Sequence, residues 1–172
     1  MQHRIDEIPL PSGPTRGRLF VTNFSAVGPD PQAALDRVGA TALACMLTDH
    51  EIELRYPAYG DWLDTHADEH SNPRALRLPT PDGGVTSDEP VLDLVAEIVG
   101  SLGGGDSVVV HCGAGMARTA VIGILTMVAF GAEPQQAAID FRAARPGGGP
   151  DGPPQEHQID RLIPRVQRLR PS

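Results

Sequence analysis

A strand, a glycine-rich turn and a helix follow one another in VVVHCGAGMARTAVIGILTM, residues 108–127. The β-branched run before His111 predicts a buried strand, and the residues after Arg118 have the composition of a buried helix. The turn between them holds Cys112, six residues before the arginine. Successive amide N–H groups in such a turn, at a helix N-terminus, can converge on one tetrahedral oxyanion. This stretch therefore predicts a βα unit with an anion-binding turn.

The rest of the chain alternates expected strands and helices. Strands are expected at 18–24, 40–48, 75–81 and 107–111, and helices at 31–39, 91–102, about 118–130, 133–145 and 155–169. Residues 50–70 indicate a helical turn, a loop and a second short helix, and Thr86 and Glu89 have the spacing of a capping box. We expect one domain over 1–172, after a polar lead at 1–15, with an α/β fold whose central, mostly parallel sheet is flanked by helices.

Composition excludes several classes of partner. The chain has 14 basic and 22 acidic residues and a net charge of −8, which argues against general binding to nucleic acids or anionic membranes. Two cysteines make no disulfide framework and fit a reducing cytosol, so a cytoplasmic protein is expected. No signal peptide or apolar membrane span is expected either. The oligomeric state is left open.

The glycine turn has two interpretations. GAGMAR begins like the dinucleotide-binding pattern G-x-G-x-x-G, but Arg118 stands at the third glycine position and no convincing strand follows to complete that unit. In the nucleophilic interpretation, Arg118 folds back over the turn and makes a two-pronged contact with phosphate oxygens. A thiol in the same field ionises readily, so Cys112 is expected to lie beneath the phosphorus as a thiolate.

HCGAGMART, residues 111–119, resembles the H-C-x-x-G-x-x-R-[ST] signature of the cysteine-dependent protein phosphatases. The resemblance implies that Cys112 is the nucleophile, that His111 orients the loop without transferring a proton, and that the Thr119 hydroxyl stabilises the departing sulfur. It also implies a set of phosphate-binding residues: Gly113, Ala114, Gly115, Met116, Ala117 and Arg118. The similarity extends over about residues 16–165, and it implies the compact fold of the dual-specificity phosphatases.

Cleavage of a phosphate ester by a thiolate requires an acid that protonates the departing oxygen. In this superfamily the acid is an aspartate about thirty residues before the cysteine. LPTPDGGVTSDEP, residues 78–90, places Asp82 thirty residues before Cys112 and resembles the general-acid loop of dual-specificity phosphatases, particularly the kinase-associated group. Asp88 is the alternative acid, although its place at a helix start favours a capping role.

Two further roles follow only from the resemblance. A glutamine near the closing helix of the family can position the hydrolytic water, and both Gln155 and Gln158 are candidates after an unusually long interval rich in glycine and proline. Some relatives store the oxidised nucleophile as a disulfide. Cys45 lies two residues before the corresponding position, Leu47, so a bridge to Cys112 under mild peroxide is one hypothesis and inert packing is the other.

The expected activity is hydrolysis of phosphomonoesters in phosphoproteins or phosphopeptides, on phosphotyrosine and also phosphoserine or phosphothreonine, without a cofactor or metal. The histidines show no metal-ligand spacing: His3, His50, His66, His70 and His157. Lysines are missing from the loop at 113–117, which disfavours inositol phosphates as substrates. An inactive phosphate-binding module and a phosphatase of non-protein phosphoesters remain alternatives. Whether Tyr56, Tyr59 or Trp62 line the pocket or the core is left open.

Overall fold

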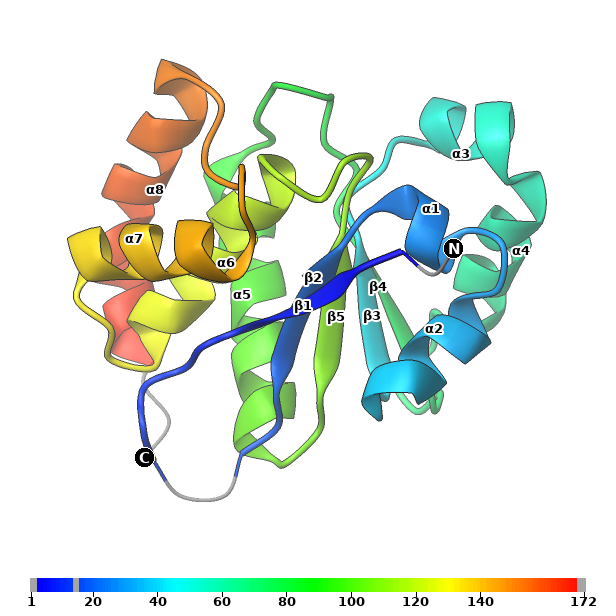
Figure 1. Cartoon of the computed structure of the whole chain (residues 1–172), viewed down its shortest axis with the longest axis horizontal. Coiled ribbons are helices and arrows are strands. Elements are labelled where there is room, and N and C mark those ends of the chain that lie inside the picture. The colour runs from blue at the N-terminus through cyan, green and yellow to red at the C-terminus, as the bar shows by residue number, and fades with distance from the viewer. Residues whose placement is uncertain (1–2, 14–15, 170–172) are drawn as a thin grey trace.

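The computed structural model describes residues 3–13 and 16–169 and contains one five-stranded sheet, with helices on both faces (Figure 1). The strand order is β1-β2-β5-β3-β4. β1 runs antiparallel to β2, and the other neighbouring strands are parallel. The bounds are β1 Ile5–Ile8, β2 Leu19–Thr22, β3 Ala42–Cys45, β4 Arg74–Arg77 and β5 Val108–His111. The expected α/β fold with a mostly parallel sheet is confirmed.

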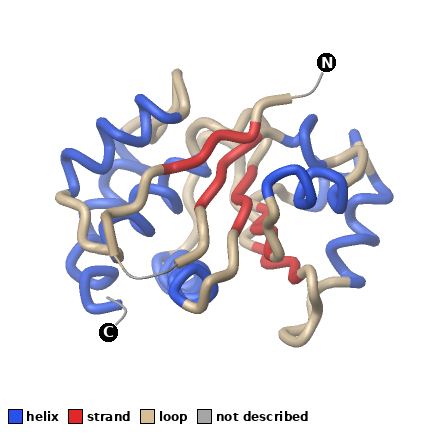
Figure 2. Tube along the Cα trace, turned by 60° about the horizontal axis from the view of Figure 1, so that its bottom comes forward, coloured by secondary structure: helices blue, strands red, loops and turns tan. Residues whose placement is uncertain are grey.

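Two groups of helices enclose the strands, as Figure 2 shows. One group is α1 Phe24–Val27, α2 Pro31–Val38, α3 Asp49–Arg55 and α4 Pro57–Thr65. The other is α5 Asp88–Gly103, α6 Arg118–Ala129, α7 Pro134–Ala144 and α8 Pro153–Val166, followed by the short 3₁₀ helix η1 Gln167–Leu169. Within residues 3–13 and 16–169, none of the helices has the length and hydrophobicity of a membrane span.

Burial explains why these segments form their elements. Every residue of β2, β3 and β5 is buried, as expected for parallel strands covered on both faces. Along β5 the side chains alternate between two apolar clusters, with Val108 and Val110 on the side of α5 to α8 and Val109 on the side of α1 to α4. All residues of α6 are buried, because this helix packs against α5, α7 and α8 as well as β5.

The parallel strands β2, β5, β3 and β4 have their carboxyl ends at the same end of the sheet. β5 lies between β2 and β3, and His111 at its end is in register with Thr22 and Cys45. The loops after β5, β3 and β4 all leave the sheet at this carboxyl end, which is the usual place for ligand sites in α/β folds.

Sequence analysis missed one strand and misplaced the cap of one helix. The polar lead contains β1, an edge strand whose acidic residues are held by ion pairs: Asp6 with Arg4 and Arg145, and Glu7 with Arg18. The N-cap of α5 is Ser87, one residue after the Thr86 that the capping-box spacing predicted, and the helix begins at Asp88. No side chain caps this end, so the box of Thr86 and Glu89 does not form.

Candidate active site

The backbone carbonyls of the β5–α6 loop, residues 112–117, bond to groups that surround the loop. Gly113 O accepts from Phe24 N at 2.9 Å and Met116 O from Gly149 N at 3.0 Å. Between them, Ala114 O and Gly115 O each accept from the Arg145 guanidinium at 3.1 Å. Four consecutive carbonyls are therefore fixed from outside, by α1 and by the chain that follows α7.

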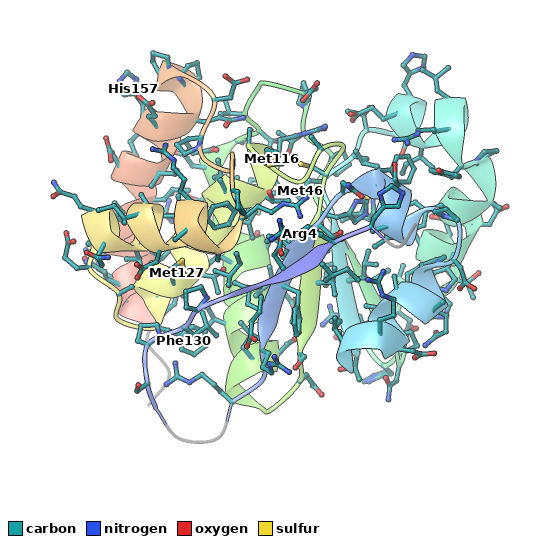
Figure 3. All side chains as sticks on the ribbon, viewed as in Figure 1. Arg4, Met46, Met116, Met127, Phe130 and His157 are labelled. Carbon is teal, nitrogen blue, oxygen red and sulfur yellow. The ribbon has the colours of Figure 1, made fainter. Side chains whose placement is uncertain are left out.

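The loop amides consequently face its interior. In a planar trans peptide, the N–H of one residue points opposite to the carbonyl of the residue before it. Among the described residues, no protein acceptor bonds the N–H groups of residues 113–118. Figure 3 labels Met116 on this loop, at the same end of the sheet as Met46. Convergent, unpaired amides at a helix N-terminus suit a tetrahedral anion, so the start of α6 is a candidate anion site.

Two glycines make this backbone path possible. Gly115 has φ +72°, and a Cβ there would lie 2.3 Å from Thr22 O of β2. Gly113 lies close to Arg118, since its Cβ would be 3.2 Å from Nη2 of that guanidinium. A side chain at position 115 therefore requires the loop to move away from β2.

Arg118, the first residue of α6, is only 2% exposed and lies against the loop. Both Nη atoms donate to the Glu51 carboxylate, at 2.8 and 2.9 Å, and Nη1 also donates to Thr80 O at 2.8 Å. Its Nε is buried without a partner among the described residues. Burial alone would lower the pKa of Arg118, but the Glu51 carboxylate raises it above its ordinary value. Arg118 thus stays charged, and two of its five N–H donors, on Nε and Nη2, are left for an anion.

The capping box of α3 holds Glu51 in place. The Glu51 carboxylate accepts from Thr48 N at 2.9 Å, and the Thr48 hydroxyl caps Glu51 N. Burial would raise the pKa of Glu51, but hydrogen bonds from Arg118 and Thr48 outweigh that effect and lower it. Sequence analysis missed this residue; T-x-x-E at 48–51 signals a helix start, but it does not reveal a partner 67 residues away.

Asp82 lies at the corner of a tight turn in the β4–α5 loop, residues 78–87. Gly84 N donates to Pro81 O at 2.9 Å, and Gly83 has φ +70°, as a type II turn requires at its third position. The Asp82 side chain is 87% exposed, and its Oδ1 lies 3.5 Å from Nη2 of Arg118. The turn therefore presents a carboxyl group beside the guanidinium, at the edge of the anion site.

A buried pair of hydrogen-bonded side chains, Tyr59 and His111, adjoins Cys112. Burial lowers the pKa of His111 to about 4, so its ring is neutral. The Tyr59 hydroxyl pairs with its Nε2, and its Nδ1 lies 3.1 Å from Cys112 O. Burial also raises the pKa of Tyr59 well above its ordinary value, so the phenol donates to Nε2 and the Nδ1–H donates to the Cys112 carbonyl. His111 thus orients the start of the loop, and Tyr59 belongs to the core.

The remaining predicted residues occupy distinct positions. Thr119 is fully buried, and its hydroxyl bonds no group among the described residues, including the carbonyls of its own helix. Gln155 and Gln158 are buried and bond the β4–α5 loop. Asp88 is engaged by Gln158 and Arg161, which leaves it ill suited as an acid.

The structure argues against a Cys45–Cys112 bridge. Cys45 belongs to the apolar cluster on the side of α1 to α4, and Cys112 to the cluster on the other face of the sheet. Both thiols are free and buried. Burial raises the pKa of Cys45 to about 11, and its thiol adjoins Tyr59. The inert-packing alternative is the one that this geometry supports.

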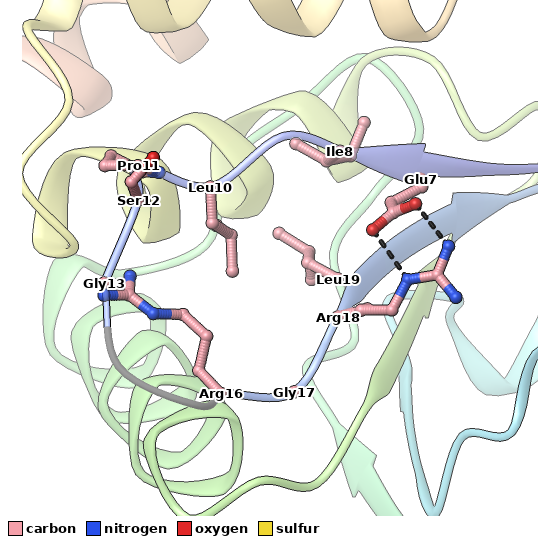
Figure 4. A pocket seen from close by; sticks show the side chains of 10 residues that line it. All are labelled: Glu7, Ile8, Leu10, Pro11, Ser12, Gly13, Arg16, Gly17, Arg18 and Leu19. Atoms are coloured by element: carbon pink, nitrogen blue, oxygen red, sulfur yellow. Dashed lines mark hydrogen bonds and ion pairs between the residues drawn. The ribbon is translucent and has the colours of Figure 1, made fainter.

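No group of three metal-ligating side chains occurs in the described part of the chain. A cavity of about 300 Å³ lies beside the chain that leads from β1 to β2, lined by residues that include Ser12, Arg16 and Arg18 (Figure 4). It lies where β1 ends and β2 begins, at the end of the sheet opposite the β5–α6 loop. None of the residues proposed from sequence to act on phosphate lines it.

Solved structures of phosphatases share this fold. Kinase associated phosphatase, with its catalytic-site cysteine replaced by serine, superposes with a TM-score of 0.77 at 16% identity over 97% of each chain. The human tyrosine phosphatase-like serine/threonine/tyrosine-interacting protein gives 0.73 at 21% identity over 96% of this chain and 99% of that one. Human DUSP28 gives 0.64 at 18% identity over 87% of this chain and 94% of that one. No family model and no curated protein sequence matches the chain. The chain has the fold of the dual-specificity phosphatases.

Proposed function

We propose that this protein is a cysteine-dependent phosphomonoester hydrolase that acts on phosphoproteins through a cysteinyl-phosphate intermediate. One observation carries the proposal: the loop that begins at Cys112 directs unpaired amides inward, while the buried cation Arg118 lies against it. An anion held by these donors has its central atom near the sulfur. The acidic net charge of the chain does not oppose this, because the field at the site is local.

In the first step, the Cys112 thiolate attacks phosphorus and the ester P–O bond breaks. Asp82 gives its proton to the departing oxygen. The loop amides and Arg118 hold the equatorial oxygens, whose charge they stabilise most strongly in the transition state. The ion pair with Glu51 fixes the plane of the guanidinium, so that Nε–H and the second Nη2–H are the donors left for phosphate.

In the second step, Asp82, now ionised, takes a proton from water as the water oxygen attacks phosphorus. The S–P bond breaks, inorganic phosphate forms and the thiolate returns. The Thr119 hydroxyl, buried and unpaired among the described residues, is the donor that we assign to the departing sulfur. No metal or cofactor takes part in this scheme.

We propose phosphotyrosine as the main substrate, with phosphoserine and phosphothreonine as further substrates, within one phosphatase domain in the cytoplasm. The resemblance of the loop to that of dual-specificity phosphatases supports this range. The neutral residues at 113–117 offer no extra cations for a highly charged inositol phosphate.

The test is turnover of an aryl phosphate by paired cysteine variants. Cys112→Ser should abolish hydrolysis, while Cys45→Ser, at a buried thiol on the other face of the sheet, should keep it. Rapid quenching of the wild type should trap one phosphate on Cys112. Unchanged activity in Cys112→Ser would refute the proposal. Phosphopeptide binding without any turnover by the wild type would favour the second candidate, a phosphate-binding module, a possibility that the relative named as an interacting protein keeps open.

A further inference from the structure

Helix α8 presents three polar side chains on one face to the β4–α5 loop. Gln155, Gln158 and Arg161 are spaced three residues apart, which places them on the same side of a helix. Gln155 is fully buried and Gln158 is 2% exposed, whereas the Arg161 side chain is 54% exposed. Two buried glutamines at a helix surface need hydrogen-bond partners, because an unsatisfied buried amide is costly.

The groups to which both glutamines donate lie just after Asp82 in the chain. Gln155 donates to Gly84 O at 3.0 Å and accepts from Asp151 N at 2.7 Å. Gln158 donates to Thr86 O at 2.6 Å and to the Asp88 carboxylate at 3.1 Å. The two glutamines of α8 thus supply donors to Gly84 O and Thr86 O, two backbone carbonyls of the loop.

Arg161 continues this row of contacts. Its guanidinium donates to both carboxylate oxygens of Asp88, at 3.0 and 3.1 Å. Asp88 begins α5, so the start of that helix is tied to α8 as well. The loop carries attachments to α8 at every second residue from Gly84 to Asp88.

The other side of Asp82 is fixed equally firmly. Thr80 is buried; its N–H donates to Met46 O at 3.1 Å, and its carbonyl accepts from Arg118 at 2.8 Å. The space left behind the loop, between Thr80, Gly84, Arg118 and Gln158, is about 10 Å³. That volume is about one water molecule, so the loop is packed down onto the site.

We propose that Gln155 and Gln158 are positioning residues that hold the β4–α5 loop in its working position, so that Asp82 meets the leaving group without a loop movement. The inference rests on the proposed function, because Asp82 acts as the acid there. It gives these glutamines a different role from the water-positioning one that the family resemblance suggested: both amide groups bond loop carbonyls. α8 thereby sets the efficiency of proton donation from a distance.

The test compares two substrates that differ in their need for an acid. Phenyl phosphate has a basic leaving group, whereas an aryl phosphate with strongly electron-withdrawing substituents leaves without full protonation. General acid catalysis contributes about 10²- to 10⁴-fold, so Gln155→Met and Gln158→Met should each lower kcat/KM for phenyl phosphate about tenfold or more. Their kcat/KM for the activated ester should fall less than about threefold, because this ratio reports cleavage of the ester bond and excludes the later hydrolysis step that both esters share.

The control is Gln136→Met, at an exposed glutamine of α7 that bonds Asp140 on the same helix. This variant should hydrolyse both esters at the wild-type rate. Asp82→Asn should also lose more activity on phenyl phosphate than on the activated ester, and its loss should be larger than that of the glutamine variants. Arg161→Gln, at an exposed side chain, should show a smaller selective loss and keeps the test decisive if a methionine variant fails to fold. If the Gln155 and Gln158 variants lost activity equally on both esters, or lost none on either, the positioning role would be overturned. The proposed phosphatase function would remain intact.

Hydrogen exchange tests the attachment of the loop to α8 separately from the proposed phosphatase function. In Gln155→Met and Gln158→Met, the amides of residues 80–88 should exchange faster, and those of 108–118 should not change. This holds even if the wild type turns over no ester, in which case the proposed function fails and the attachment of the loop to α8 stands. Unchanged exchange at 80–88 would overturn the positioning role.

Discussion

Arg145 fixes the β5–α6 loop, and its replacement should affect both stability and phosphate binding. The guanidinium is 4% exposed, bonds the carbonyls of Ala114 and Gly115, and pairs with Asp6 of β1 at 2.8 Å. Arg145→Met leaves two carbonyls without donors and Asp6 without its buried partner. Breaking a buried pair costs about 3–5 kcal/mol, a large part of a typical stability of about 5–15 kcal/mol.

Arg145→Lys is the more informative change. Lysine keeps the charge beside Asp6, but a single ammonium group cannot replace the planar fork that bonds two successive carbonyls. We expect a loss of about 1–3 kcal/mol in the free energy of unfolding, since hydrogen bonds to charged groups are worth about that much. The freed peptides can rotate, and misdirecting one oxyanion donor lowers kcat by about 10²-fold or more.

The assay combines urea unfolding with kcat/KM for an aryl phosphate and the inhibition constant for vanadate. Both activity measures should worsen in Arg145→Lys under conditions where the variant is folded. Arg165→Met is the matched control: its guanidinium pairs with Glu89 at the surface, where ion pairs contribute little, so the change should leave both stability and activity near the wild-type values. Wild-type kcat/KM and vanadate affinity in Arg145→Lys would refute the view that this residue directs the loop amides.

Three further predictions concern residues around the loop. Glu51→Gln keeps the capping-box pattern but removes the charge opposite Arg118, so kcat/KM should fall about tenfold, about 1.4 kcal/mol; an unchanged value would contradict an orienting role. Because the pKa of His111 is about 4 in the folded chain and 6.5 ordinarily, the unfolded state protonates first. Stability should therefore be intact above pH 6.5 and fall by about 3 kcal/mol towards pH 4, and His111→Gln should lose that dependence. Gly115→Ala should destabilise by more than about 2 kcal/mol, whereas Gly100→Ala, at an open position in α5, should stabilise by about 0.5–1 kcal/mol.

The strand–turn–helix unit could be predicted because its information is local. A β-branched run, two glycines and an apolar helix specify the path of residues 108–127 without reference to the rest of the chain. The same holds for the turn around Asp82, where P-D-G-G specifies a tight corner. The structure places these two segments within 3.5 Å of each other, through Asp82 and Arg118.

The supports of the loop could not be predicted, since they depend on contacts between distant positions. Arg145 bonds carbonyls 30 and 31 residues away, and Tyr59 pairs with His111 across 52 residues. Nothing near these residues in the sequence identifies their partners. β1 was missed for the same reason: IDEI looks polar until Asp6 is seen to pair with Arg145.

The most direct test of the account is alkylation of the two cysteines at pH 6, where an ordinary thiol is almost fully protonated and slow. Cys45, with its pKa raised to about 11 by burial, is the internal control and should remain unmodified. The account predicts rapid modification of Cys112 by a small alkylating reagent, suppressed by inorganic phosphate or vanadate and lost in the Cys112→Ser variant. Slow modification of Cys112 at pH 6, or modification that phosphate does not suppress, would contradict an anion site built around its sulfur.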